Sequence, residues 1–233
     1  MLKNDDKIQI LNSRSRSGII KSIRKTTDGK TTKKIQPFSV SYAGGIGPSL
    51  EKDFITHLEE LKGGIILANS LKALIPQLSD LIKKESVQNV TCLEESLRLS
   101  LEGNGFPGIL GSSLSENTEM VISGCEYLVA DLGAIVVSSA QAGSRRMFCY
   151  PPVHVVIADA SQMVGTLDDA YTLLLEKYKN RLPSLISIIA GPSRTADIEK
   201  TLVLGAHGPK RIFVCLIEES ESRALEPLKN LKY

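Results

Sequence analysis

Short apolar runs alternate with amphipathic helical patterns along most of this chain. Residues 65–68 and 87–93 have the apolar, β-branched composition of buried strands, and residues 71–84 place apolar side chains every three or four positions. Such alternation favours a mainly parallel sheet covered by helices, because parallel neighbours need a crossover connection. The other expected strands cover residues 126–131, 134–139, 153–158, 185–190 and 212–217, and the other expected helices cover residues 49–62, 115–123 and 167–180. The sequence therefore predicts an α/β three-layer domain, with an antiparallel hairpin across Leu132-Gly133.

The N-terminal part of the chain differs from the rest in charge. Residues 1–36 carry ten Lys or Arg and three Asp, whereas the whole chain has a net charge of only +2. Residues 9–25 have the spacing of a short basic amphipathic helix, and the following stretch has the composition of a linker. We therefore expect residues 1–48 to be an arm and residues 49–233 to be the α/β domain. Nucleic acid is not an expected partner, because the basic stretch contains no aromatic residue to stack on bases.

Composition narrows the class of protein further. Apolar residues make up 42% of the chain and charged residues 23%, as in globular proteins. No apolar run approaches the ~20 residues that cross a bilayer, and the polar N-terminus lacks the core of a signal peptide. The cysteines have no metal-ligand or cluster spacing, so we expect reduced thiols in a cytoplasmic protein and no metal site. They are Cys92, Cys125, Cys149 and Cys215.

The richest cluster of polar side chains follows the apolar run at 185–190. Gly191-Pro192 ends that strand, and Ser193 or Thr195 can cap a following helix. A helix N-terminus with a nearby arginine can hold a carboxylate or phosphate, while a neighbouring carboxylate carries a proton. The alternative is a well-capped helix with surface ion pairs. The candidate anion-binding residues are Ser193, Arg194 and Thr195, and the candidate catalytic residues are Asp197 and Glu199.

Two further segments carry candidate site residues. Asp131 leaves a strand just before a glycine, where a carboxylate can act as a general base or cap a turn. The loop from Ser138 ends in Arg145 and Arg146, which suits either anion contacts or a solvated loop.

Histidines are the last group of candidates. His207 lies in a glycine-flanked turn before the final strand and is a candidate catalytic residue. His154 opens a strand, and we expect it to be a hydrogen-bonded structural histidine.

The segments 191–199 and 205–209 read GPSRTADIE and GAHGP, and they closely resemble the signature of the LUD-domain family. The resemblance extends over roughly residues 60–218, and more weakly over the N-terminal helix. It implies a fold similar to that of the ribose-5-phosphate isomerase and CoA-transferase group. The chain departs from the family at 131–134, where Asp-Leu-Gly-Ala stands in place of the usual Glu-Thr-Gly-Thr, so Asp131 keeps the carboxylate but is one methylene shorter.

The resemblance also implies a function. The family is linked to oxidation of L-lactate to pyruvate together with iron–sulfur partner proteins. This chain has neither a cluster-ligating cysteine motif nor a G-x-G-x-x-G fingerprint, so we expect the iron–sulfur clusters on the partners and no cofactor here. A subunit or accessory role with a small carboxylic acid or phosphate ligand follows.

Two other classes of function stay open. One is a stand-alone enzyme of the same fold group that acts on a phosphorylated sugar or an acyl-CoA. The other is a non-catalytic binding or scaffolding subunit. A homo-oligomer is compatible with each of them.

Overall fold

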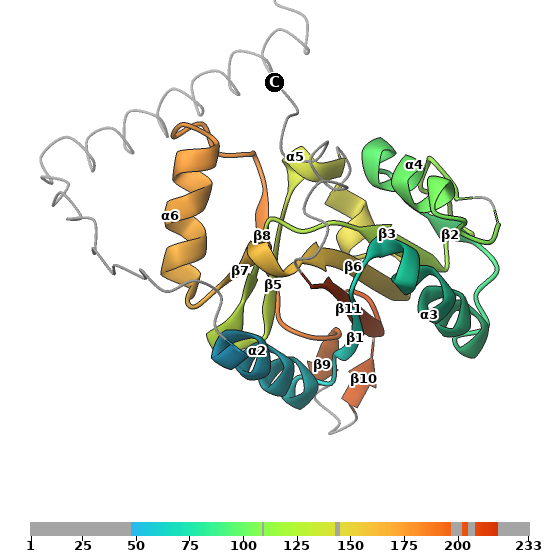
Figure 1. Cartoon of the computed structure of the whole chain (residues 1–233), viewed down its shortest axis with the longest axis horizontal. Helices are drawn as coiled ribbons and strands as arrows, with labels where there is room; N and C mark the ends of the chain where they lie inside the picture. The colour runs from blue at the N-terminus through green and yellow to red at the C-terminus, as the bar shows by residue number, and fades with distance from the viewer. Residues whose placement is uncertain (1–47, 109, 143–144, 197–201, 205–207, 219–233) are drawn as a thin grey trace, which may run out of the picture. The chain divides into compact units, whose positions relative to one another are not determined.

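The computed structural model describes residues 48–108, 110–142, 145–196, 202–204 and 208–218. The sequence-predicted basic helix and linker lie outside these residues, so the proposed division at residue 48 stays a prediction. Figure 1 labels the helices and strands that the described residues form.

A five-stranded parallel sheet, in the order β1-β11-β6-β3-β2, forms the centre of the fold. Its long inner strands are almost entirely buried because both faces of the sheet are covered. The strands are β1 (Gly64–Ala68), β2 (Val90–Thr91), β3 (Met120–Ser123), β6 (Val153–Asp159) and β11 (Arg211–Ile217).

One face of this sheet is covered by two helices, α3 (Leu71–Lys84) and α4 (Glu95–Gly103). Helix α3 begins at Ser70, whose side chain accepts a hydrogen bond from the N–H of Ala73. Its leucines and isoleucines pack with the apolar side chains of β3 and β6 in one cluster. The helix predicted over 71–84 is confirmed, and Pro76 lies within it. Helix α4 was not predicted from the sequence.

The other face packs on helix α2 (Pro48–Glu60) and on a second sheet, in the order β7-β4-β5-β8. Strands β4 (Tyr127–Val129) and β5 (Ala134–Ser138) form the predicted antiparallel hairpin, joined by the 3-10 turn η1 (Ala130–Leu132). The remaining strands of this sheet are β7 (Met163–Val164) and β8 (Ile186–Ile189), and β7 follows the 3-10 turn η3 (Ala160–Gln162).

Helix α6 (Leu167–Lys177) covers the far face of the second sheet. A capping box between Thr166 and Asp169 starts the helix. Ala170 and Leu174 are buried against the sheet, whereas Tyr171, which the sequence pattern directs inward, is 50% exposed. The predicted α/β architecture with a mainly parallel sheet is confirmed, and the second sheet adds to it.

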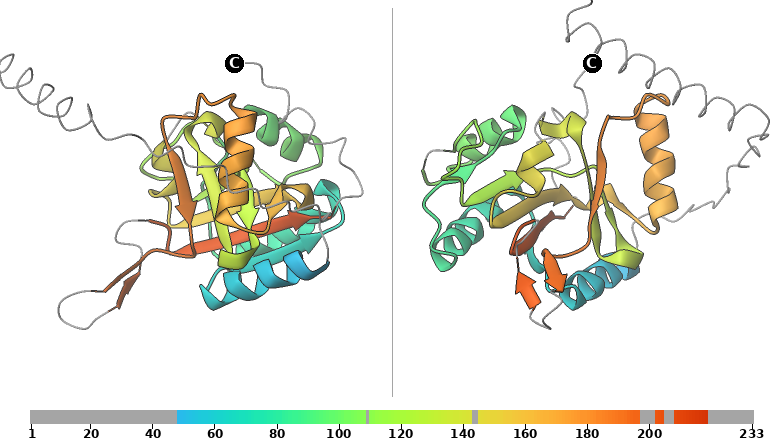
Figure 2. Two further views of the ribbon diagram at one scale, coloured as in Figure 1. Left: turned by 90° about the vertical axis from the view of Figure 1, so that its left-hand side faces the viewer. Right: turned by 180° about the vertical axis from the view of Figure 1, so that it is seen from behind.

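Two segments differ from the sequence predictions in secondary structure. Residues 120–123, predicted as the end of a helix, form β3. The prediction is wrong because a strand buried on both faces has a continuous apolar sequence, which does not differ in pattern from that of a buried helix. The predicted helix after Ser193 is replaced by β9 (Arg194–Ala196), which pairs antiparallel with β10 (Leu202–Leu204). This hairpin stands apart from the two larger sheets (Figure 2). Cross-strand pairing overrides the local capping signal, so there is no helix N-terminus at residues 194–196.

Candidate functional site

A pocket of about 490 Å³ lies beside β8 and the residues that follow it. It brings together three of the residues singled out in the sequence, Arg145, Ser193 and Arg194, although Arg145 is far from the other two along the chain. We call it the Arg145 pocket. Its remaining lining comes from Phe148, Cys149, Leu185, Ser187, Ile188, Ile189, Ala190, Gly191, Pro192, Gly208 and Pro209.

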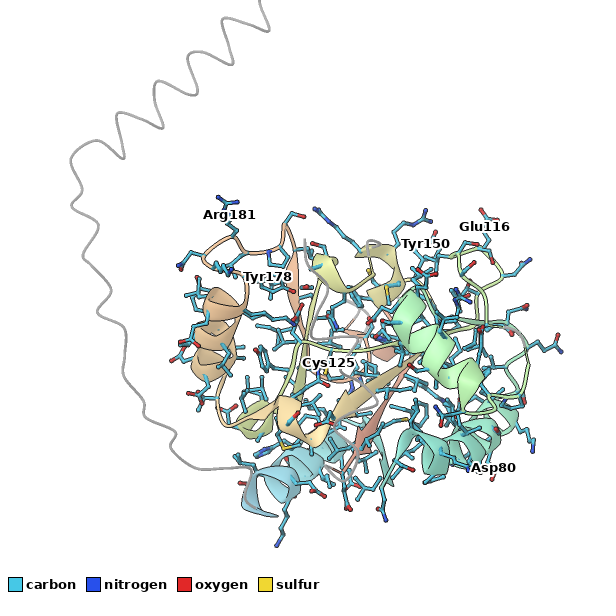
Figure 3. All side chains as sticks on the ribbon, turned by 45° about the horizontal axis from the view of Figure 1, so that its top comes forward. Asp80, Glu116, Cys125, Tyr150, Tyr178 and Arg181 are labelled. Atoms are coloured by element: carbon cyan, nitrogen blue, oxygen red, sulfur yellow. The ribbon has the colours of Figure 1, made fainter. Side chains whose placement is uncertain are left out.

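Arg145 begins the 3-10 turn η2 (Arg145–Phe148), which follows helix α5 (Ser139–Ala142). Its guanidinium donates a 2.7 Å hydrogen bond to Oγ of Ser184, just before β8. The guanidinium of Arg146 instead lies over the ring of Tyr150, 4.7 Å from its centroid. Figure 3 places Tyr150 at the periphery of the described fold. The structure thus brings Arg145 to the pocket and not Arg146.

Ser193 and Arg194 are held by close backbone packing. The N–H of Ser193 donates to the carbonyl of Pro209 at 2.9 Å, and the guanidinium of Arg194 donates to the carbonyl of Leu61 just beyond α2. A cation suits that position, because helix C-termini carry partial negative charge. Gly191 has a φ of 76°, and a Cβ there would lie 2.7 Å from the Leu61 carbonyl oxygen. Glycine is therefore required at the turn that the sequence signature begins with.

The other candidate site residues are not among those that line this pocket in the described part of the chain. Thr195 lies in β9, while Asp197, Glu199 and His207 lie outside the described residues, so their roles stay predictions. Asp131 lies in η1, away from the pocket lining. Partial burial raises the pKa of Asp131, and nearby His57 opposes that shift.

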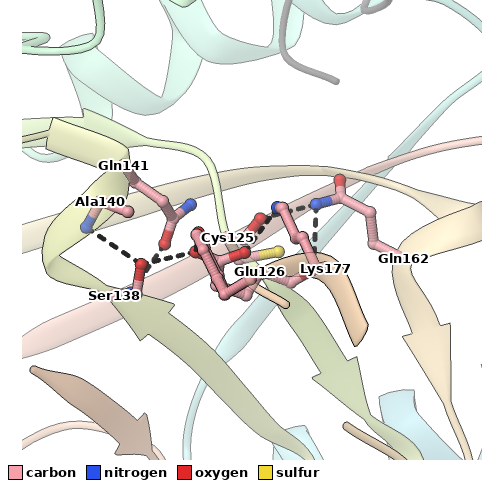
Figure 4. A network of polar contacts seen from close by, with 8 residues as sticks. Cys125, Glu126, Ser138, Ala140, Gln141, Gln162 and Lys177 are labelled. Carbon is pink, nitrogen blue, oxygen red and sulfur yellow. Dashed lines mark hydrogen bonds and ion pairs between the residues drawn. The ribbon is translucent and has the colours of Figure 1, made fainter. Parts of the chain in front are cut away.

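A buried polar network, which the sequence reading missed, surrounds Glu126 (Figure 4). The Glu126 side chain is fully buried, and its Oε1 accepts hydrogen bonds from Ser138 Oγ at 2.5 Å and Tyr178 Oη at 2.7 Å. Its Oε2 pairs with Nζ of Lys177 at 2.7 Å. Gln162 Nε2 donates to the preceding carbonyl, that of Cys125, at 2.6 Å. The network ties α6 to the β4–β5 hairpin and compensates a buried charge.

Glu94 lies near this network at the carboxyl end of β2. Its Oε1 accepts the N–H of Gly124 at 2.8 Å, and the side chain is buried. Burial raises the pKa of Glu94 to about 7; the Gly124 hydrogen bond opposes the shift and the charge of Glu126 adds to it. Ligand sites in open α/β sheets lie at the carboxyl ends of strands. That rule could have pointed to Glu94, which follows the strand predicted over 87–93. Glu126 follows β3, which the sequence pattern predicts as part of a helix.

His154 is a structural histidine, as predicted. It is fully buried and its Nε2 lies 2.8 Å from Ser123 Oγ, which donates to the carbonyl of Gly124. The His154 Nε2 therefore carries the proton. Burial lowers the pKa of His154 to about 4, so the ring is neutral near pH 7.

The cysteines are mostly buried thiols. Burial raises the pKa of Cys92 and Cys215 to about 12, and Figure 3 places Cys125 in the interior. Cys149 is exposed and lines the Arg145 pocket. Among the described residues, no three His, Cys, Asp or Glu side chains lie where they could hold a metal ion together. Within the same residues, no helix has the length and apolar character to cross a membrane.

Comparison with known proteins relates part of this chain to a known family. Residues 112–217, which include β3 through β11, match the model of the LUD domain. Lactate utilization protein C of Halalkalibacterium halodurans is 33% identical over 107 residues, or 45% of this chain and 46% of that protein. The uncharacterized protein YkgG of Escherichia coli is 32% identical over 139 residues, or 55% of this chain and 60% of that protein. The chain thus spans about half the length of the curated relatives it matches.

A solved structure shares the fold. The crystal structure of a DUF162 family protein from Deinococcus radiodurans superposes with a TM-score of 0.52 at 15% sequence identity, and the match covers 72% of this chain and 96% of that one. The resemblance expected from the sequence signature is confirmed, although the family model spans a shorter range than residues 60–218. Residues 112–217 thus match the LUD-domain family, and the chain is similar to lactate utilization proteins C.

Proposed function

We propose that this chain acts in lactate utilization, as a subunit or accessory factor in the oxidation of L-lactate to pyruvate alongside iron–sulfur partner proteins in the cytoplasm. The similarity to lactate utilization proteins C supports the pathway. The wide spacing of the four cysteines in the sequence supports assigning the clusters to partners.

The observation that carries the proposal is the convergence of Arg145 and the Ser193-Arg194 pair on one pocket. A guanidinium binds a carboxylate or a phosphate through charge-assisted hydrogen bonds. The apolar wall formed by Phe148 and Ile189 suits the carbon skeleton of a small acid. The ligand class is therefore a small carboxylic acid, with phosphate as the inorganic equivalent.

A growth experiment tests the pathway assignment. The gene is deleted in its own host and restored as wild type, Arg145→Ala or Arg146→Ala, and growth is measured on L-lactate and on glucose. We expect the deletion to slow growth on L-lactate alone, and only wild type and Arg146→Ala to restore it. Equal growth of the deletion strain and its parent on L-lactate would contradict the proposal.

A second candidate function is a stand-alone enzyme of the same fold group, acting on a phosphorylated sugar or an acyl-CoA. Glu94 favours it, because a buried carboxyl with a pKa raised to about 7 suits proton transfer at neutral pH. The purified chain assayed without partners separates the two candidates. Turnover of such a substrate that Glu94→Gln abolishes, with growth on L-lactate unaffected, would favour the enzyme.

A further inference from the structure

Strand β8 forms one edge of the second sheet, and among the described residues its only strand partner is β5. The N–H of Ser139 donates to the carbonyl of Leu185 at 3.0 Å, so these two opposed residues form a hydrogen-bonded pair. Hydrogen-bonded and non-hydrogen-bonded pairs alternate along an antiparallel ladder. Ile186 and Ile188, one and three positions further on, therefore direct their backbone N–H and C=O groups away from β5.

Within the described residues, this edge has none of the usual protection against pairing. Strand β8 contains no proline, and residues 182–193 contain no charged side chain. The Ile188 side chain is 48% exposed, and no hydrogen bond within the described part of the chain engages the outward groups of Ile186 or Ile188. Proteins normally blunt a free edge with lysine, proline or a bulge, because its unpaired groups template another strand. The β8 edge is thus suited to receive one.

Each face of the sheet carries a pocket at this edge, one lined in part by arginines and the other mainly apolar. Leu185 and Ile189 point to the face that carries the Arg145 pocket. Ile186 packs on the opposite face, where a groove of about 200 Å³ runs along α6. That groove is lined by Leu167, Ala170, Tyr171 and Leu174, with Asp168 at its side. An added strand would direct alternate side chains into the two pockets, since side chains alternate between faces.

We propose that β8 is a docking edge for an extended segment of a partner protein in which carboxylate and bulky apolar side chains alternate. The carboxylates face Arg145 and Arg194, and the apolar side chains fill the groove along α6, where Asp168 disfavours an acid. The β8 edge of a second copy is the poorer occupant, because residues 182–193 offer no Asp or Glu to either arginine. The inference rests on the proposed function only for the preference of the Arg145 pocket for carboxylates.

The test uses the full chain and a short fluorescent peptide of alternating valine and glutamate, with a valine–lysine peptide as the matched control. Ile188→Pro removes the outward N–H while leaving the bonds to β5, and edge strands tolerate proline at such positions. Ile188→Val keeps the donor. We expect saturable binding of the glutamate peptide, weakened at least about tenfold by Ile188→Pro and little changed by Ile188→Val. The lysine peptide does not bind.

Hydrogen exchange of the wild-type chain keeps the proposal testable even if Ile188→Pro fails to fold. The Ile186 and Ile188 amides should exchange fast in the free chain and become protected when the glutamate peptide binds. Protection already present in the free monomer would mean that another segment of the chain covers the edge. If the wild-type chain has the mass of a dimer in solution and the Ile188→Pro variant has the mass of a monomer, the edge pairs with a second copy. Either result, or no binding of the glutamate peptide, overturns the proposal, and none of them changes the outcome of the L-lactate growth test.

Discussion

Tyr178 Oη donates a 2.7 Å hydrogen bond to Oε1 of Glu126, a fully buried carboxylate 52 positions earlier in the chain. The contact joins the end of α6 to the start of the β4–β5 hairpin. Strand β8 belongs to the same sheet as this hairpin. The contact therefore supports the sheet on which the Arg145 pocket is built.

Tyr178→Phe should lower the free energy of unfolding by about 1.5–3 kcal/mol, the range for hydrogen bonds to charged groups. Tyr171→Phe is the matched control on the same helix, because Tyr171 is 50% exposed, and it should change stability by less than about 0.5 kcal/mol. Urea unfolding at neutral pH measures both. Equal stability of the two variants would show that the Glu126 network contributes nothing through Tyr178.

Gly124→Ala should destabilise the fold by about 1–3 kcal/mol through overpacking. A Cβ at Gly124 would lie 3.1 Å from Oε2 of Glu94 and 3.6 Å from Nε2 of Gln141. Gly103→Ala serves as the control, because a Cβ there would meet no described heavy atom within 4 Å and alanine favours the helix. Thermal melting compares them, and a Gly124→Ala protein as stable as wild type would contradict the close packing of Glu94.

Glu94 and His154 should have opposite effects on how the free energy of unfolding changes with pH. The raised pKa of Glu94 means that the folded state holds its proton up to about pH 7, so Glu94 makes stability fall as pH rises from about 4.5 to 7. The lowered pKa of His154 does the reverse, since its contribution is complete above about pH 6.5 and is lost as pH falls toward 4. Each slope has a limit of about 1.4 kcal/mol per pH unit.

Glu94→Gln should therefore reveal the His154 slope, so that stability increases with pH between about 4.5 and 6.5 more steeply than in wild type. Glu95→Gln, at the exposed neighbouring position, should leave the wild-type profile unchanged. Urea titrations across this range measure the slopes. Superimposable profiles for wild type and Glu94→Gln would exclude a raised pKa at Glu94.

The absence of a cofactor remains a prediction from the sequence. Metal analysis of the full chain, purified without its partners under anaerobic conditions, should find neither iron nor zinc in stoichiometric amount. We expect this because Cys92, Cys125, Cys149 and Cys215 lack cluster spacing. Bound iron that is lost when two of these cysteines are replaced would contradict the assignment of the clusters to partner proteins.

Most elements of the fold could be predicted because their periodicity is local. The helix at Leu71–Lys84 and the strands that became β6 and β11 follow from the spacing and composition of their own residues. The failures have non-local causes. Strand β3 is apolar on both faces, and β9 is a strand because it pairs with β10, so neither was distinguishable from a helix by its own pattern.

The candidate site divides in the same way. Arg145 and Arg194 were identifiable as residues suited to anions, but only the fold could separate Arg145 from its neighbour Arg146. The burial of Glu94 and Glu126 could not be predicted, because a charged residue beside an apolar strand is ordinarily exposed. Their burial depends on partners such as Lys177, 51 positions from Glu126, which no local pattern connects.

Calorimetric titration of the full chain with L-lactate, pyruvate and phosphate tests the central claim most directly. Arg145→Ala should weaken binding by about 1.5–3 kcal/mol, the range for a charge-assisted hydrogen bond, with the free energy of unfolding little changed. Arg146→Ala should bind like wild type, because its guanidinium lies over Tyr150 outside the pocket lining. If wild type and Arg145→Ala bind each anion with the same affinity, or if neither protein binds any of the three, the assignment of the Arg145 pocket as a small-acid site is contradicted.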